Sequence, residues 1–231
     1  MEYKVKLSVL VPALNEAHNL RTVIEAVKSV PLEKEIVVID DGSTDDTLKV
    51  LSEYESDPQV VVRSLPHTRG KGFAIREGLQ LATGDVLIIQ DADLEYDPAQ
   101  IPALVEPILE GRADVVYGSR FRGSIEGMHF ANRLANYILT FAANLLYRAG
   151  ITDEATCYKA FRTDLLRELG LQCEGFEFCP EVTAKVRLKG VRIAEVPISY
   201  VGRSTAQGKK VRWTDGFVAI WTLLKYRFGR P

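Results

Sequence analysis

Three acidic residues, Asp91, Asp93 and Glu95, follow closely on the apolar run 86–89. Asp91 and Asp93 are two residues apart, so their side chains point the same way if the chain there is extended. Paired carboxylates of this kind are suitable ligands for Mg²⁺ or Mn²⁺. Because such a cation keeps coordination positions for phosphate oxygens, the spacing indicates a nucleotide or sugar diphosphate as substrate. The alternative is a strand-end turn whose acids are solvated.

Two further polar clusters end apolar runs earlier in the chain, one containing Glu16 and the other containing Asp40. Asp40 can accept hydrogen bonds from a nucleobase or its ribose, and Glu16 from ribose hydroxyls. The second cluster also suits a turn in which Ser43 or Thr44 caps the following helix. No GxGxxG motif follows the first run, which argues against a dehydrogenase.

The segment Arg69-Gly-Lys-Gly72 precedes a predicted helix and combines two cations with flexible backbone. This combination favours anion binding at a helix N-terminus, although a helix entry with solvated charges would read the same way. The segment lacks the spacing of a Walker A loop, which argues against a kinase or an ATPase.

The elements that must position these residues alternate between strands and helices in the first half of the chain, as in βαβ units with a mainly parallel sheet. We expect strands at 6–11, 35–40, 60–64, 85–90 and 114–118, with helices at 19–30, 44–54, 71–82 and 98–110 between them. We further expect helices at 128–148, 163–169, 177–189 and 213–227, and strands at 156–161 and 191–199. Ligands collect at the carboxyl ends of the strands in such sheets.

The composition fits one domain over 1–231, with a nucleotide-binding half at 1–120 and an acceptor half at 121–231. A net charge of -2 argues against nucleic acid as a partner. Three cysteines without CxxC spacing favour a reducing compartment. No apolar run reaches 18 residues, so we expect no spanning helix, but segments 129–149 and 213–228 have the amphipathic pattern of core packing or of membrane contact.

Five motifs in order resemble family-2 inverting glycosyltransferases of the GT-A fold. They are Pro12-Ala-Leu-Asn-Glu16, Val38-Ile-Asp-Asp-Gly-Ser-Thr-Asp45, Arg69-Gly-Lys-Gly72, Asp91-Ala-Asp93 and Gly118-Ser-Arg120. The second half resembles the dolichol-phosphate mannose synthase-like branch, which attaches one sugar to a polyprenyl phosphate. The resemblance implies a three-layer αβα sandwich with a mainly parallel central sheet.

The resemblance also implies roles for particular residues. The nucleotide sugar would be bound by Pro12, Ala13, Asn15, Glu16, Asp40, Asp41, Lys71, Asp91 and Ala92. The ligands of Mg²⁺ or Mn²⁺ would be Asp91, Asp93 and Glu95. The catalytic set would be Asp93, Arg120, Arg203 and Lys209, of which the three cations position the acceptor phosphate or hold the diphosphate.

The expected reaction is metal-dependent transfer of a hexose to a polyprenyl phosphate with inversion. Mannose from GDP-mannose is preferred to a UDP-glucose-type donor because of the branch resemblance. Transfer to a soluble hydroxyl acceptor, such as a sugar or a glycerate, is the alternative, and it would need Asp93 or Glu177 as a base. The Gly-rich signature of nucleotidyltransferases is absent from the sequence, which argues against that class. A non-catalytic binding protein is disfavoured because every acidic residue of the motifs is present. We expect a cytoplasmic protein at the cytoplasmic face of the membrane, held by peripheral contact.

Overall fold

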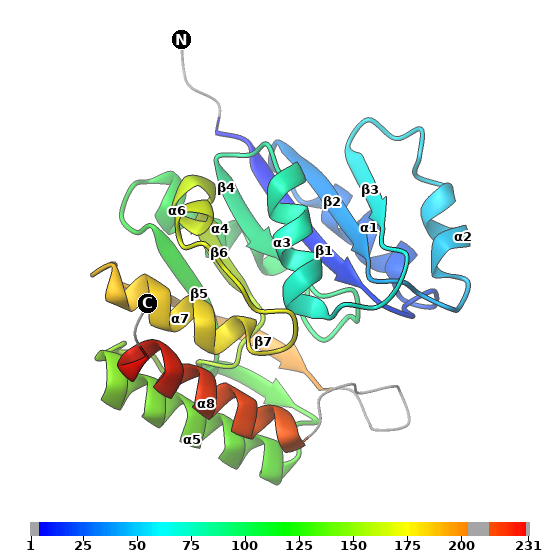
Figure 1. Ribbon diagram of the computed structural model, residues 1–231. Helices are drawn as coiled ribbons and strands as arrows, with labels where there is room; N and C mark the ends of the chain where they lie inside the picture. Colours follow the sequence, from blue (N-terminus) through cyan, green and yellow to red (C-terminus); the bar gives the residue numbers. More distant parts are fainter. Residues whose placement is uncertain (1–4, 203–212, 230–231) are drawn as a thin grey trace.

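The computed structural model describes residues 5–202 and 213–229, and it places a seven-stranded sheet at the centre of the protein (Figure 1). The strand order is β3-β2-β1-β4-β6-β5-β7. Strand β6 is antiparallel to both of its neighbours, whereas all the other pairs of neighbours are parallel. The strands are β1 (Leu7–Ala13), β2 (Lys34–Asp40), β3 (Val60–Ser64), β4 (Val86–Ile89), β5 (Val115–Glu126), β6 (Lys159–Arg162) and β7 (Ala194–Val201). The predicted α/β class with a mainly parallel sheet is confirmed.

Helices cover both faces of this sheet and make the three layers that the GT-A resemblance implied. They are α1 (Leu20–Ser29), α2 (Thr47–Ser52), α3 (Lys71–Leu81), the 3₁₀ turn η1 (Pro98–Gln100), α4 (Ile101–Leu109), α5 (Phe130–Tyr147), α6 (Thr163–Glu168), α7 (Phe178–Leu188) and α8 (Trp213–Phe228). Val9 and Val11 of β1 pack with α1, α2 and α4, whereas Leu10 packs with the cluster that contains α3 and α5 to α8. Side chains of one strand therefore alternate between two cores.

The middle of the sheet is buried on both faces, which explains why β1, β2 and β4 read as nearly continuous apolar runs. Helix α3 lies so close to β1 that a Cβ atom added at Gly78 would be 2.7 Å from Leu10 Cδ1. This close packing fixes where α3 begins, and its first residue, Lys71, belongs to the candidate site described below.

Several predicted boundaries are wrong. Strands β6 and β7 begin at Lys159 instead of 156 and at Ala194 instead of 191. For two others, contacts between distant segments give the reason. Strand β5 continues to Glu126 instead of ending at 118, because it pairs in parallel with β7 on both sides of an irregularity between Ser119 and Ser124. Helix α2 begins at Thr47 instead of 44, and neither Ser43 nor Thr44 caps it. Both of these residues are engaged by Asn15 in the neighbouring loop.

The last helix, α8, packs against α5 and α7 (Figure 1). Glu181 of α7 fastens it by accepting a hydrogen bond from Tyr226 Oη at 2.6 Å, and it also accepts from the backbone N–H groups of Gln172 and Cys173 at 2.8 Å. Burial disfavours the carboxylate, but these bonds and Lys185 outweigh burial and lower the pKa of Glu181 to about 2.

Glu181→Gln should therefore lower the free energy of unfolding by about 3 kcal/mol at pH 7. The carboxylate has a lower pKa in the folded than in the unfolded chain, where the ordinary value is 4.5. Its contribution is complete above that value and is lost as pH falls through the folded pKa. Urea unfolding at pH 7 and at pH 3 should show a smaller difference between variant and wild type at pH 3.

The matched control is Glu106→Gln, the same exchange at an exposed position of α4. It should change stability by less than about 0.5 kcal/mol at either pH. A Glu181→Gln protein as stable as the wild type at pH 7 would mean that this network does not hold α8.

Candidate active site

The carboxyl ends of β1, β2 and β4 meet at one edge of the sheet. Ala13 at the end of β1 is in register with Asp40 at the end of β2, and Gln90 N donates to Leu10 O at 2.9 Å on the other side of β1. Pro12 is half-buried beside Ala13. The structure thus brings together the first, second and fourth of the sequence motifs at this edge.

The loops after β1 and β2 are fastened to each other through Asn15, which has a positive φ of 50°. Asn15 N donates to Ser43 Oγ at 2.8 Å, and Asn15 Oδ1 accepts from Thr44 N at 2.8 Å. The neighbouring Glu16 is buried, and its N–H donates to Thr47 Oγ1 at 3.0 Å. Together these contacts fix the backbone of the predicted nucleoside-binding loops.

Asp40 and Asp41 are both buried but have different surroundings. Within residues 5–202 and 213–229, the Asp40 carboxylate accepts long hydrogen bonds of 3.3 Å from Ser43 N. Asp41 accepts from Arg69 N and Gly70 N, both at 2.8 Å, so its two oxygens hold the loop before α3. Of the two carboxylates, Asp40 is therefore the one that could replace its present hydrogen bonds with hydrogen bonds to a nucleoside.

Two N–H groups at the start of α3 are already bound by the protein, which leaves less of the backbone for the anion binding predicted at Arg69-Gly-Lys-Gly72. Gly72 N donates to Gly175 O at 3.1 Å, and Phe73 N donates to Glu174 O at 3.0 Å. Gly70 has a φ of 108°, and a Cβ atom there would be 2.3 Å from Glu174 O. The glycines are therefore required by the close approach of the 173–175 segment.

Lys71 is the cation of this segment that reaches the acidic motif, where it forms an ion pair with Asp91 Oδ1. Its Nζ also donates to Cys157 Sγ at 3.1 Å. Burial alone would lower the pKa of Lys71, but the Asp91 carboxylate and Cys157 hold that pKa well above the ordinary value of 10.5. Lys71 is thus a half-buried, charged ammonium in direct contact with the carboxylate at the end of β4.

The other acids of the motif have partners of their own. Asp93 Oδ1 accepts from Glu95 N at 3.1 Å, and Glu95 Oε2 accepts from Tyr200 Oη at 2.8 Å. Ala92, between Asp91 and Asp93, is buried. Burial and the nearby Glu95 raise the pKa of Tyr200, so its hydroxyl stays a hydrogen-bond donor. The turn is therefore tied to β7 as well as to α3.

The carboxylates fit a divalent cation in chemistry, because Asp91 and Asp93 supply hard oxygen ligands at a strand end. Across residues 5–202 and 213–229, however, no three His, Cys, Asp or Glu side chains are gathered as a group that could hold a metal ion. Glu95 is directed to Tyr200, so the predicted third ligand has another contact here. The donor set that fits is the pair Asp91 and Asp93, with the remaining positions left for the substrate.

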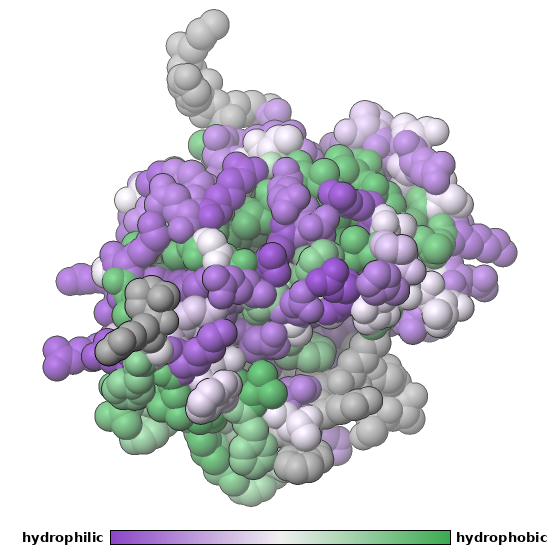
Figure 2. Space-filling view, in the orientation of Figure 1, coloured by the Kyte–Doolittle hydropathy of each residue, from purple (hydrophilic) through white to green (hydrophobic). Residues whose placement is uncertain are grey.

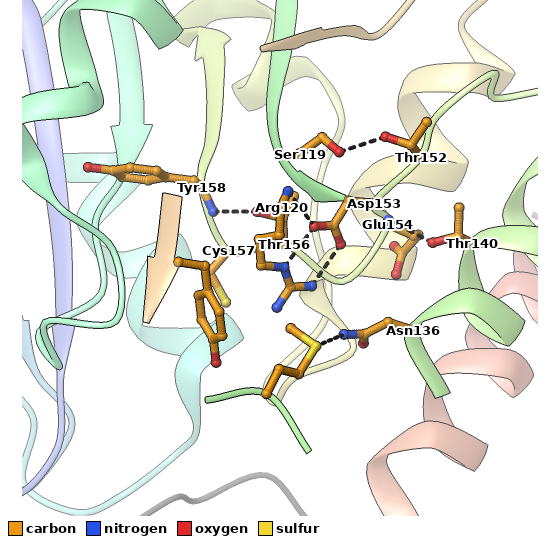
Figure 3. A network of polar contacts seen from close by, with 12 residues as sticks. Ser119, Arg120, Asn136, Thr140, Thr152, Asp153, Glu154, Thr156, Cys157 and Tyr158 are labelled. Atoms are coloured by element: carbon orange, nitrogen blue, oxygen red, sulfur yellow. Dashed lines mark hydrogen bonds and ion pairs between the residues drawn. The ribbon is translucent and has the colours of Figure 1, made fainter. Parts of the chain in front are cut away.

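Arg120 lies in the middle of β5, where its guanidinium is paired with a carboxylate of the protein (Figure 3). Its Nε and Nη2 donate to Asp153 Oδ2 and Oδ1, both at 2.7 Å, and its backbone N–H donates to Oδ2 at 3.0 Å. Both side chains are buried, at 6% and 0% exposure. The bidentate hydrogen bonding expected for a phosphate is directed to Asp153, which leaves Nη1 as the guanidinium nitrogen outside this pair.

Arg203 and Lys209, the other two predicted catalytic cations, lie outside the described residues. The strand that leads to them, β7, is bound to the acidic motif by Tyr200 and by the hydrogen bond from Val201 N to Glu95 O at 3.1 Å. The described end of β7 therefore lies next to the acidic motif.

Several residues that support the site were missed by sequence reasoning. Glu195 of β7 accepts from Thr152 N at 2.8 Å and Asp153 N at 3.1 Å, and so positions the partner of Arg120. Tyr158 Oη donates to Gln90 Oε1 at 2.6 Å and thereby holds the strand end before Asp91. Asp153 itself carried a signal, because a buried arginine in a strand requires a carboxylate partner.

Lys159 and Glu177 also have structural contacts. Lys159 is fully buried, with Nζ donating to Glu154 O and Thr156 O at 2.7 Å and lying 3.8 Å from the centre of the Tyr117 ring. Glu177 Oε1 accepts from the N–H groups of residues 174 and 175, at 3.1 and 3.0 Å. Both residues hold the segments that surround the site.

Known proteins resemble this chain over most of its length. A hexosyltransferase of low-salt glycan biosynthesis, Agl6, from Haloferax volcanii is 31% identical over 202 residues, which are 84% of this chain and 47% of that protein. A dolichol-phosphate mannosyltransferase from Pyrococcus furiosus is 30% identical over 89% of this chain and 59% of its own length. An undecaprenyl-phosphate mannosyltransferase from Micrococcus luteus is 28% identical over 97% of this chain and 100% of its own. The chain thus spans less than two thirds of the first two relatives.

Among solved structures, glucosyl-3-phosphoglycerate synthase from Mycobacterium tuberculosis, in complex with Mn²⁺, UDP and glucosyl-3-phosphoglycerate, superposes with a TM-score of 0.74 at 25% identity. The match covers 98% of this chain and 81% of that one. The sequence model of glycosyl transferase family 2 matches residues 8–170, which include every motif at the sheet edge. The chain is therefore a glycosyltransferase and belongs to glycosyl transferase family 2.

Proposed function

We propose that this glycosyltransferase transfers a single hexose from a nucleotide-diphosphate sugar to a polyprenyl phosphate, with inversion, to give a β-linked lipid-phosphate sugar. The preferred donor is GDP-mannose, because two of the relatives are named as polyprenyl-phosphate mannosyltransferases. The observation that carries the lipid acceptor is a large exposed apolar surface on α5 and α8.

That surface, here called the α5/α8 face, is built from two stripes at helical spacing (Figure 2). Its exposed side chains are Phe130, Leu134, Tyr137, Ile138, Phe141 and Leu145 on α5, with Phe217, Val218, Trp221, Leu224 and Phe228 on α8. Exposed basic residues lie on or next to the same helices, among them Arg148 and Lys225. Two adjacent amphipathic helices with aromatic and basic residues suit the interface of an anionic bilayer.

A polyprenyl phosphate needs no general base, because its phosphate is already anionic near neutral pH. Asp40, Asn15 and Glu16 would receive the nucleoside, while Lys71 would hold Asp91 in place and contribute positive charge beside the diphosphate. Arg120 Nη1, Arg203 and Lys209 would orient the acceptor phosphate. Mg²⁺ or Mn²⁺ held by Asp91 and Asp93 would neutralise the leaving nucleoside diphosphate.

A soluble phosphorylated acceptor is the second candidate, favoured by the likeness to glucosyl-3-phosphoglycerate synthase over nearly the whole chain. A hydroxyl acceptor needs a base. Glu177 already uses Oε1 on two backbone N–H groups, so Asp93 is the carboxylate to test in that role. The α5/α8 face has no evident use in such a reaction, which is why the lipid acceptor is preferred.

The deciding assay measures transfer of labelled sugar from GDP-mannose and from UDP-glucose to polyprenyl phosphate in detergent, with and without Mn²⁺ or Mg²⁺. A parallel reaction offers 3-phosphoglycerate instead of the lipid. A metal-dependent lipid product supports the proposal and identifies the donor. A product with 3-phosphoglycerate and none with lipid would replace it with the second candidate.

We further propose that the α5/α8 face binds the cytoplasmic side of a membrane. Across the described residues, no helix combines the length and the apolar character that crossing a bilayer requires. The three cysteines are unpaired thiols, as suits a reducing compartment. Peripheral binding through this face would place the site near a phosphate at the bilayer surface.

The double variant Phe141→Asp/Trp221→Asp should bind liposomes of phosphatidylglycerol and phosphatidylcholine about a thousandfold more weakly than the wild type, since each ring contributes about 2 kcal/mol when buried in the bilayer. Phe141 is 68% and Trp221 66% exposed, so the folded core should tolerate the exchanges. Liposome co-sedimentation measures the binding.

The control is Leu48→Asp, which introduces one such carboxylate on α2, where Leu48 is 45% exposed. This variant should co-sediment like the wild type. Equal binding of the wild type and the double variant would remove the α5/α8 face from the proposal.

A further inference from the structure

Two cysteines lie together beside the donor site and have no part in the proposed transfer. Cys157 precedes β6, and Cys179 is in the first turn of α7; both are half-buried. They line one small pocket with Lys71, Ile89, Phe176 and Phe178. The Cys179 thiol donates to the backbone oxygen of Thr156, the residue before Cys157, at 3.5 Å, so the two sulfurs are neighbours in this pocket.

The electrostatics of this pocket make the two sulfurs unequal. The neighbouring Cys157 thiol, together with the charges of Lys159 and Lys71, outweighs burial and lowers the pKa of Cys179. The same contact and burial raise the pKa of Cys157. Cys179 is therefore the more readily ionised of two adjacent thiols, which is the arrangement of an attacking and a resolving thiol.

We propose that Cys157 and Cys179 form a reversible disulfide when the protein meets a peroxide, and that this bond switches off the donor site. The Cys179 thiolate attacks one peroxide oxygen, the O–O bond breaks, and hydroxide leaves, giving a sulfenic acid at Cys179. The Cys157 sulfur then attacks the Cys179 sulfur and loses its proton, and the S–O bond breaks. The proton of Cys157 and the proton that Cys179 released on ionisation combine with the two hydroxide groups, so two thiols and one peroxide give one disulfide and two waters.

The link to the donor site is Lys71, and this step of the inference rests on the proposed function. Lys71 Nζ contacts both Cys157 Sγ and the Asp91 carboxylate. A disulfide removes the thiol proton, draws the Cys157 sulfur toward α7 and changes the position of the ammonium that holds Asp91. Small displacements of positioning groups have large effects on transfer rates.

The third cysteine is a matched control within the chain. Cys173 is buried, and burial and the nearby Glu181 raise the pKa of its thiol. It should therefore stay a thiol under conditions that oxidise the other two.

The test treats wild type, Cys179→Ser and Cys173→Ser with hydrogen peroxide and measures intact mass, the cross-linked peptides after proteolysis, and transfer activity before and after dithiothreitol. Wild type and Cys173→Ser should lose two hydrogens in mass, yield a peptide pair joined through Cys157 and Cys179, and lose transfer by about tenfold or more. Dithiothreitol should restore both. Cys179→Ser should form no cross-link and keep its activity in peroxide.

Two outcomes would overturn the inference: oxidation that joins no Cys157–Cys179 pair, or a complete disulfide with unchanged transfer. Mass and peptide mapping do not depend on turnover, so a wild type that forms the cross-link but shows no transfer even before oxidation would count against the proposed function and not against the disulfide. If Cys179→Ser does not fold, limited alkylation of the wild type replaces it, and Cys179 should then be the first thiol labelled.

Discussion

Asp91→Asn is expected to reduce sugar transfer by about a thousandfold, equivalent to about 4 kcal/mol of barrier. The variant loses one of the two carboxylates that can bind Mg²⁺ or Mn²⁺. The same change removes the counterion of Lys71, whose charged form is maintained by that carboxylate against the effect of burial. Transfer measured over a range of Mn²⁺ concentrations checks both consequences, because excess metal should restore little activity.

The matched control is Asp97→Asn, the same exchange six residues further along the same turn. Asp97 is exposed and accepts a hydrogen bond from Ala99 N at 2.9 Å, which an asparagine oxygen can also accept. This control should transfer sugar at close to the wild-type rate. If Asp91→Asn folds normally by circular dichroism and transfers as fast as Asp97→Asn, the acidic motif is not the metal site.

The order and type of the elements were predictable because each buried strand and amphipathic helix has its own local pattern. The runs 7–11, 36–39 and 86–89 are apolar since both faces of the central strands are covered. The second part of β5 was not predictable. Its residues past Ser119 are mostly half-buried or exposed, and they are strand only because β7 pairs with them some 75 positions later in the chain, as in the pair of Ser124 with Ser199.

The site was predictable in location but not in its contacts. Strand ends at one edge of a parallel sheet bring the motifs of β1, β2 and β4 together whatever the loops do. Which side chains then pair depends on segments far apart in sequence. Tyr200 and Glu95 are 105 positions apart, and Arg120 and Asp153 are 33 apart. No local pattern records such pairs, so Arg120 alone suggested a phosphate where the fold supplies a carboxylate.

These long-range pairs join the acidic motif to the basic side of the site. Tyr200 donates to Glu95, and its ring lies 5.2 Å from the guanidinium carbon of Arg120. Asp153 holds Arg120, and Glu195 holds Asp153. The groups proposed to bind the donor and the acceptor are thus connected by one network. Within it, losing one partner of the buried Arg120–Asp153 pair should cost the most free energy of unfolding, because the other charge would stay buried without a countercharge.

Asp153→Asn is accordingly expected to lower the free energy of unfolding by about 3–5 kcal/mol, because Arg120 would remain buried without a countercharge. Asparagine keeps the size of the side chain, so the loss reports charge and hydrogen bonding and not a cavity. Urea unfolding measures it. Asp164→Asn is the control, since the Arg162–Asp164 pair is more than half exposed on both sides and should contribute less than about 1 kcal/mol.

The double variant Arg120→Met/Asp153→Leu separates the structural role of Arg120 from its proposed contact with the acceptor phosphate. Replacing both charges with apolar side chains should recover most of the stability that Asp153→Asn loses, because no buried charge is left unpaired. Transfer should nevertheless stay low, since the guanidinium nitrogen Nη1 proposed to orient the phosphate is gone. A double variant that is both stable and fully active would show that Arg120 serves the fold alone, and the acceptor phosphate would then have to be held by the basic residues that follow β7.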